Sequence, residues 1–153
     1  MQVEIRRDDP RTGRAHDLVV RHLAGMHENS PPESVHALGV EALADPSERF
    51  WSAWAGAELA GIGAVKALDG YRGEIKSMRV ADAFLGQGIG RRMLRHIVAD
   101  ARARGVRSLW LETGSTPDFT PAVRLYESEG FTRCPPFPPY VDDPFSLFLT
   151  RPL

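Results

Sequence analysis

The sequence contains a single cysteine, Cys134, so it has neither an internal disulfide nor a cysteine-built zinc site. It also has no excess of one charge, because 19 Lys and Arg residues stand against 20 Asp and Glu residues. A net charge of −1 gives no general attraction to nucleic acid or to an anionic membrane surface. No segment has the pattern of a signal peptide or the length of a membrane span. We therefore expect a cytoplasmic protein.

The residues that are present predict one globular domain over residues 1–153, since 42% are hydrophobic and 25% are charged. Periodicity and turn residues give the order β-α-α-β-β-β-α-β-α-β-β. We expect strands at 2–7, 49–55, 58–68, 72–80, 108–113, 131–134 and 145–150, and helices at 15–27, 33–43, 89–104 and 118–129. The first half of the chain forms antiparallel strands and then passes into a parallel βαβ unit. This order predicts an α/β fold whose sheet is mixed, as in α+β proteins.

The most informative stretch is a glycine-rich turn between the strand at 72–80 and the third helix. Its residues are Gly86, Gln87, Gly88, Ile89 and Gly90, followed by Arg91 and Arg92. Glycines allow close backbone approach, and a helix N-terminus with arginines beside it suits an anion. The turn therefore predicts a phosphate site, and a flexible helix entry with solvated arginines is the alternative.

The turn matches neither of two common phosphate motifs. A P-loop needs Lys after its last glycine, and a dinucleotide fold needs a different glycine spacing. The turn instead resembles motif A of the GNAT superfamily of acetyl-CoA-dependent N-acyltransferases, through Gly88-Ile89-Gly90. Residues 121–131 (PAVRLYESEGF) resemble a second segment of that superfamily, A-x-x-L-Y-E-x-x-G-F. Residues 31–38 and 111–115 are similar to a bacterial subgroup of small GNAT proteins.

The resemblance implies a GNAT-like fold and acetyl-CoA as cosubstrate. It implies that the cofactor's pantetheine arm pairs with the backbone of Met78, Arg79 and Val80. The pyrophosphate would then rest on the amides of Leu85, Gly86, Gln87, Gly88, Ile89, Gly90 and Arg91. Two residues depart from the superfamily pattern: Leu85 replaces the usual Gln or Arg, and Phe119 replaces a cofactor-contacting Asn.

Catalytic roles follow from the same resemblance. Tyr126 occupies the usual position of the general acid, where a protonated phenol donates to the departing thiolate, although a core tyrosine is the alternative. From their positions on neighbouring strands, Glu74 and Glu112 are both candidates for the general base, with Glu74 ahead, and an ion pair with Lys76 or with an arginine is the alternative for either. Strand alternation places Glu74 on one face with Lys76, Met78 and Val80. His22, His27 and His36 are further candidates, and His36 is the best of the three.

The acceptor site is expected where the first helices meet the last loop. Its candidate residues are Glu33, Ser34, His36 and Tyr140, with Asp142 and Asp143 placed to attract a cationic amine. The sequence thus predicts direct acetyl transfer from acetyl-CoA to a primary amine of a small molecule or peptide in a ternary complex. We expect no metal and no nucleic acid or membrane partner. A homodimer is compatible with the sequence. A non-catalytic CoA-binding sensor or scaffold, and an enzyme using another acyl group or an oxygen acceptor, remain open.

Overall fold

The computed structural model describes residues 1–153 as one seven-stranded sheet with helices on both faces. The strand order is β1-β2-β3-β4-β5-β7-β6. The strands are β1 (Glu4–Arg7), β2 (Glu48–Ala55), β3 (Glu58–Ala67), β4 (Arg72–Val80), β5 (Ser108–Gly114), β6 (Thr132–Arg133) and β7 (Ser146–Pro152). The helices are α1 (Gly13–Asn29), α2 (Val40–Leu43), α3 (Ile89–Ala103) and α4 (Thr120–Ser128), with short 3-10 turns η1 (Pro32–Ser34), η2 (Asp82–Phe84) and η3 (Pro117–Phe119). The predicted mixed α/β sheet is confirmed.

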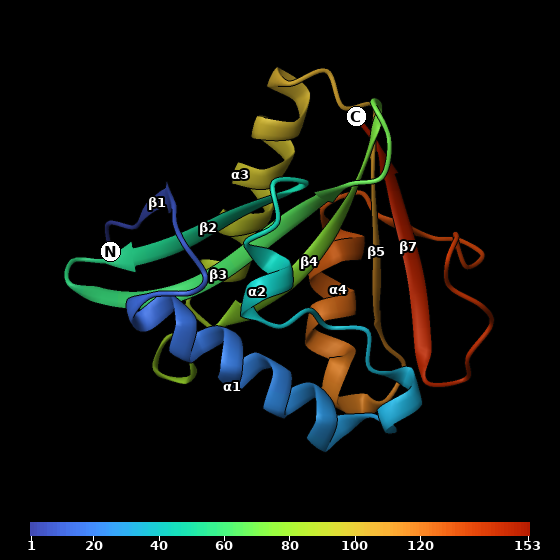
Figure 1. Ribbon diagram of the computed structural model, residues 1–153, viewed down its shortest axis with the longest axis horizontal. Coiled ribbons are helices and arrows are strands. Elements are labelled where there is room, and N and C mark those ends of the chain that lie inside the picture. Colours follow the sequence, from blue (N-terminus) through green and yellow to red (C-terminus); the bar gives the residue numbers. More distant parts are fainter.

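The β4–β5 pair is the only parallel pair in the sheet, and it is short. Pairing begins at Arg72 opposite Ser108 and ends at Glu74 opposite Trp110. Beyond these residues the two strands diverge (Figure 1), and residues 75–80 of β4 have no strand partner on the β5 side. We call residues 75–80 the unpaired edge of β4.

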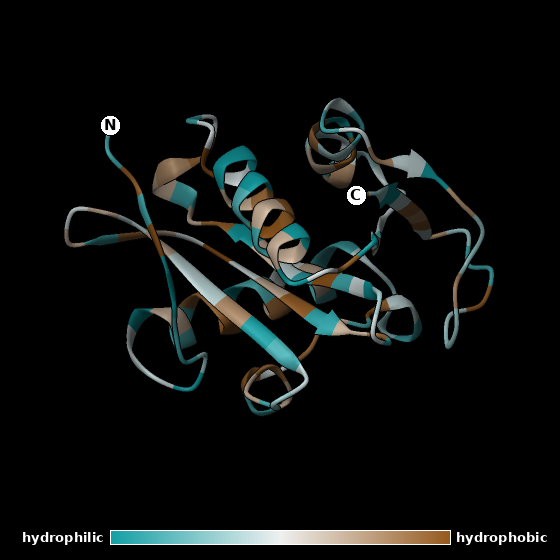
Figure 2. Ribbon diagram, turned by 90° about the horizontal axis from the view of Figure 1, so that it is seen from above, coloured by the Kyte–Doolittle hydropathy of each residue, from teal (hydrophilic) through white to brown (hydrophobic).

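Helices lie on both sides of the sheet (Figure 2), and one hydrophobic cluster lies on each face. The apolar residues of α3 recur at helical spacing and are buried against one face: Ile89, Met93, Leu94, Ile97, Val98 and Ala101. The other face is covered by α1 and α2, through a second cluster that includes Leu18, Val19 and Leu43. None of these helices combines the length and the apolar character needed to cross a membrane.

The helix predicted at 33–43 is wrong. Only residues 32–34 form a 3-10 turn, the chain then extends from Val35 to Gly39, and α2 begins at Val40. Val35 has φ −92° and ψ 113°, and Gly39 is also extended. Local helical spacing is overridden here by a contact with another part of the chain, because His36 leaves the helical path to bond Glu112 on β5.

The predicted common face of Glu74, Lys76, Met78 and Val80 is also wrong, because β4 contains a bulge. Ser77 has φ +53°, the only positive value at a non-glycine residue, and the β3–β4 register shifts beside it. One extra residue reverses the alternation of side chains. Glu74 and Lys76 therefore lie on the α1 face, whereas Met78 and Val80 pack into the cluster around α3.

We predict that the bulge is strained at Ser77. A left-handed residue without a special partner costs free energy, and the Ser77 hydroxyl is buried with no hydrogen-bond partner. Ser77→Gly should therefore raise the free energy of unfolding by up to about 1 kcal/mol in urea titration. Ser77→Val also removes the hydroxyl but is β-branched, so it should lower stability instead. A glycine variant less stable than the wild type would contradict the strain.

A second prediction concerns Glu48, which is 7% exposed and has one carboxylate oxygen without a partner. Burial raises the pKa of Glu48 from 4.5 to about 7, although Lys66 and Lys76 oppose the shift. The folded state thus holds this proton more tightly than the unfolded chain, and the resulting stability is lost as pH rises through about 7.

Glu48→Gln cannot ionise, so its stability relative to the wild type should improve between pH 5 and pH 8, by as much as about 3 kcal/mol. Thermal or urea unfolding at both pH values measures this difference. Glu58→Gln, at an exposed site on the neighbouring strand, is the control and should show no such trend. An equal difference at both pH values would show that Glu48 is ionised without penalty.

Candidate active site

The unpaired edge of β4 presents backbone groups rather than side chains. Around the bulge, Met78 packs towards Gly63 and α3, and Arg79 reaches Gly25 on α1. The Val80 side chain lies beside Gly90 at the start of α3. With side chains directed to the two faces, the main chain of residues 78–80 is left facing the side where β5 has diverged. Such an edge can pair with an extended ligand.

The glycine-rich turn places open backbone at the end of this strand. Gly86 has φ +75° and Gly88 has φ +82°, and a Cβ at either position would meet no atom within 4 Å. Gly88 is the N-cap of α3 and no side chain caps the helix, so the first amides of α3 keep their N–H groups free. Leu85 is 62% exposed beside the turn. Free amides at a helix N-terminus are suited to holding an anion.

Gly90 serves a different purpose from the two turn glycines. A Cβ there would lie 3.1 Å from Leu125 Cδ2, so glycine lets α4 approach the first turn of α3. Its neighbour Ile89 is part of the core rather than the surface. Of the seven residues predicted to hold pyrophosphate, these two contribute backbone only.

The side chains of the turn have partners within the protein. The Arg91 guanidinium donates to Glu129 and to Ser128 Oγ at the end of α4. Arg92 reaches the carbonyl of Met1, at 3.4 Å. The Gln87 side-chain amide donates to the Ala83 carbonyl. Both arginines nevertheless keep further N–H groups outside these contacts.

On the α1 face of the sheet, Glu74 belongs to a buried charge cluster. Lys76 Nζ lies 3.1 Å from Glu74 Oε2, and the Tyr140 hydroxyl donates to the same oxygen at 2.6 Å. Lys76 also donates to the Tyr140 hydroxyl at 2.6 Å. Burial and the bond to Glu74 raise the pKa of Tyr140. The ion pair of Glu74 with Lys76, the alternative that the sequence offered to a catalytic role for Glu74, is confirmed.

A second pair adjoins this cluster. His36 Nδ1 lies 2.7 Å and 2.8 Å from the two carboxylate oxygens of Glu112, and the His36 ring packs edge-on against Tyr140 at 5.1 Å. Burial raises the pKa of Glu112, while the adjacent His36 opposes that shift. His36 is 36% exposed and Glu112 is 11% exposed, so the pair lies at the surface of the cluster.

The last loop is tied to the same place. Ser34 Oγ donates to Asp143 at 2.5 Å, and this bond and the Phe145 amide lower the pKa of Asp143. Glu33 and Asp142 are exposed, and neither joins these contacts. We call the joined residues the polar network: Ser34, His36, Glu74, Lys76, Glu112, Tyr140 and Asp143. Three of the four predicted acceptor residues therefore converge with both predicted carboxylates, and Glu33 does not.

The other two histidine candidates lie on α1 outside this network. His22 has a buried Nδ1 without a partner, and burial, with the charge of Arg79, lowers its pKa to about 4. His27 is exposed near the end of the helix. Neither has a carboxylate partner that would orient its ring.

Tyr126 lies on the opposite face, inside the core around α3. Its side chain is 6% exposed, its ring packs edge-on against Phe131, and its hydroxyl forms no hydrogen bond with the protein. Burial raises the pKa of Tyr126, so the phenol stays protonated at neutral pH. Phe119, where relatives place Asn, packs its ring directly over Gly114 at the end of β5.

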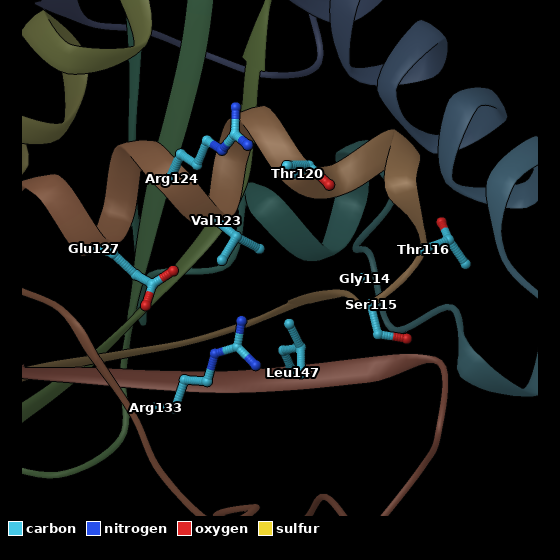
Figure 3. Close-up of a pocket in the computed structure, with 9 residues that line it drawn as sticks. All are labelled: Gly114, Ser115, Thr116, Thr120, Val123, Arg124, Glu127, Arg133 and Leu147. Carbon is cyan, nitrogen blue, oxygen red and sulfur yellow. The ribbon is translucent and has the colours of Figure 1, made fainter.

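A separate hollow of about 210 Å³ lies between α4 and β7 (Figure 3), and none of the predicted site residues lines it. Arg133 and Val123 point into the hollow (Figure 3), and Arg124 on α4 also lines it. The candidate active site remains the one built around β4, where the predicted site residues lie.

The chain is similar to known proteins in sequence. A family model described as the acetyltransferase (GNAT) family matches residues 8–131. The N-acetyltransferase YsnE of Bacillus subtilis is 52% identical over 146 residues, which are 95% of this chain and 97% of its own. The N-acetyltransferase YedL of Escherichia coli is 46% identical over 149 residues, which are 97% of this chain and 94% of its own.

Solved structures share the whole fold. An acyl-CoA N-acyltransferase from Klebsiella pneumoniae superposes with a TM-score of 0.82 at 25% identity, covering 99% of this chain and 98% of its own. A GNAT acetyltransferase from Elizabethkingia anophelis with acetyl-CoA bound has a TM-score of 0.72 at 21% identity, with 99% and 98% covered. The family match spans most of the chain, and relatives aligned over nearly their full lengths are N-acetyltransferases. The family expected from the two sequence motifs is confirmed: this chain belongs to the GNAT family of acetyltransferases, whose members use acetyl-CoA.

Proposed function

We propose that this protein transfers the acetyl group of acetyl-CoA to a primary amine of a small molecule or peptide, directly and within a ternary complex. The supporting observation is the two-sided character of the site. An unpaired strand edge ends at free helix amides on one side, and a charged network lies on the opposite face of the same strand. A cofactor and an acceptor can therefore approach one point from different sides.

In this proposal the cofactor is bound mainly by main chain. The pantetheine amides pair with Met78, Arg79 and Val80, and the diphosphate binds the amides from Leu85 to Arg91. The exposed Leu85 and the Phe119 ring over Gly114 supply no polar side chain to the cofactor. Backbone donors at a helix N-terminus suffice for an anion, so these two departures weaken the cofactor site without removing it.

The acceptor enters over the polar network. Ser34, His36 and Tyr140 line the acceptor site, and Glu33 lies at the outer edge of that site. The carboxylates of the network favour a cationic amine over an anionic acceptor. Transfer then requires a base that takes a proton from the amine, for which Glu74 and the His36–Glu112 pair are the two candidates. It also requires an acid that protonates the departing thiolate, and Tyr126 fills that role.

The direct test is release of free thiol from acetyl-CoA by the purified protein against a panel of alkylamines, arylalkylamines and peptides with free amino termini. Thiol release that depends on an amine, with the N-acetyl product found by mass spectrometry, is the expected result. A protein that binds acetyl-CoA tightly yet turns over with no amine would instead be a non-catalytic CoA-binding module.

The turn glycines give a sharper prediction about binding. Gly88→Val puts a branched side chain at φ +82°, where the diphosphate is proposed to meet the amides. Acetyl-CoA affinity, measured by titration calorimetry, should fall at least tenfold, the equivalent of about 1.4 kcal/mol. Gly105→Val is the matched control, because Gly105 has φ +81°, open space around it and a place at the other end of α3. Equal losses of affinity in both variants would attribute the effect to strain.

Tyr126→Phe tests the acid. The ring and its packing against Phe131 are kept, so acetyl-CoA affinity and thermal stability should change little. Loss of a positioned general acid should lower kcat by ~10²-fold or more, since the bond to sulfur strengthens as charge develops. A thioester with a more acidic thiol should react at similar rates with both proteins.

Tyr71→Phe, at an exposed site, is the control for that substitution. Normal turnover by Tyr126→Phe would show that the phenol has no part in the reaction. A lower melting temperature with normal kcat would make Tyr126 a core residue only.

A further inference from the structure

We infer that His36, held by Glu112, is the general base that takes the proton from the acceptor amine, and that Glu74 is not. This inference rests on the proposed function and assigns the step that the proposal leaves between two candidates. His36 would contact the amine directly and is therefore a catalytic residue. Glu112 acts through the imidazole and is a positioning residue.

The contact between the two side chains fixes which nitrogen carries the proton. Both oxygens of Glu112 lie within 2.8 Å of His36 Nδ1. An ionised carboxylate only accepts hydrogen bonds, so Nδ1 donates and carries the hydrogen. The lone pair of the neutral imidazole is then on Nε2, to which no protein group donates. A carboxylate that orients a histidine and stabilises its charged form is a recurring arrangement for a base.

The position of Glu112 brings this base to the reacting point. Glu112 is two residues beyond Trp110, the last β5 residue that pairs with β4, so it lies where the strands have diverged. Residues two apart on a strand share a face, and Glu112 therefore points to the same face as Trp110 and its partner Glu74. The pair stands beside the unpaired edge of β4, on the face opposite the core that contains Tyr126.

Glu74 is poorly suited to the same task. It is 3% exposed, and both Lys76 and the Tyr140 hydroxyl are directed at its Oε2. An ammonium group and a phenol both lie on one carboxylate oxygen, so the hydrogen-bonding positions of that oxygen are already engaged by the protein. A buried, doubly engaged carboxylate is thus a fixed countercharge. Its role is to hold Tyr140, whose ring in turn packs against His36.

The proton balance of the step is complete with these groups. The ammonium form of the amine gives one proton to His36 Nε2, and the neutral nitrogen then attacks the thioester carbon. The N–C bond forms, the C–S bond breaks, and the thiolate takes a proton from Tyr126 as proposed above. The proton that the nitrogen loses as the amide forms passes through solvent to the phenol, and His36, which is 36% exposed, returns its own proton to solvent. The products are the N-acetyl amine and free CoA.

The charges that face His36 come from three elements. They are Glu112 on β5, Lys76 and Glu74 on β4, and Tyr140 and Asp143 in the loop before β7. Lys76 and Glu74 form an ion pair with each other, so Glu112 and Asp143 are the two carboxylates near the ring that have no cationic side chain as a partner.

The test uses two small amines of similar size as probes. Ethylamine is protonated at neutral pH and needs a base, whereas 2,2,2-trifluoroethylamine is largely neutral and needs one much less. His36→Gln keeps a donor for Glu112 but has no titrating group. At saturating acetyl-CoA and pH 7, its kcat/KM for ethylamine should fall by ~10²-fold, and its kcat/KM for trifluoroethylamine should fall far less.

The retained rate with trifluoroethylamine also reports that the variant is folded and binds its cofactor. Should His36→Gln prove unstable, His36→Ala with free imidazole added is the second variant, and imidazole should restore the ethylamine rate. His16→Gln is the matched control, since His16 also lies beside a carboxylate, Asp17, but on α1 away from the network. It should leave both rates unchanged.

The pH–rate profile separates positioning from structure. In Glu112→Gln the imidazolium loses its carboxylate partner, so the acid limb of kcat/KM for ethylamine should move to lower pH. Glu74→Gln should keep the acid limb where it is in the wild type. A lost acid limb in Glu74→Gln, with a normal profile in His36→Gln, would overturn the inference and make Glu74 the base.

The failures of the two proposals are distinguishable. A wild type that acetylates ethylamine, together with a His36→Gln variant that does so at the same rate, overturns only the assignment of His36. A wild type that releases no thiol with either amine overturns the proposed function, and the base assignment falls with it.

Discussion

The early end of the β4–β5 pairing is the constraint on which the rest of the site depends. Parallel strands normally satisfy each other's backbone groups along their length, yet here the ladder ends at Glu74 opposite Trp110. Everything C-terminal to this point on β4 must find other partners, and the bulge at Ser77 also turns two side chains away into the core. The strand then leads directly to a helix whose first amides are free. An extended, phosphate-bearing molecule is the natural partner for such an arrangement.

The other face of the same strand carries charges that are mostly compensated within the protein. Glu74 is paired with Lys76, and Glu112 accepts a hydrogen bond from His36. Breaking one partner of such a buried pair is costly, because the other charge is left without compensation. The network therefore holds the segment 35–39 and the loop before β7 against the sheet, although neither is a helix or strand. The contacts of the network therefore fix the positions of these two segments at least as much as they stabilise the fold.

Much of the fold follows from local sequence, whereas the site depends on contacts that no local pattern contains. The limits of β4 were predictable from the alternation of its residues, and those of α3 from helical spacing. The bulge was not, because Ser77 is an ordinary strand residue until its backbone turns left-handed. The helix expected at 33–43 failed because the His36–Glu112 bond joins residues 76 apart in sequence. The Tyr140 bonds to Glu74 and Lys76 likewise join residues more than 60 apart in sequence, whereas the Glu74–Lys76 pair follows from alternation within one strand.

Differences in burial give the proposed proton transfers a direction. Tyr126 is almost wholly enclosed, and burial raises its pKa, so it enters the reaction protonated and can only donate. His36 lies at the surface of the network with an unoccupied nitrogen, so it can accept a proton and pass it to water. Two titrating groups placed in unlike environments take opposite roles at the same pH. The sheet keeps them on different faces, with the thioester proposed to lie between them, and proton transfer between the two side chains is thereby prevented until the substrates connect them.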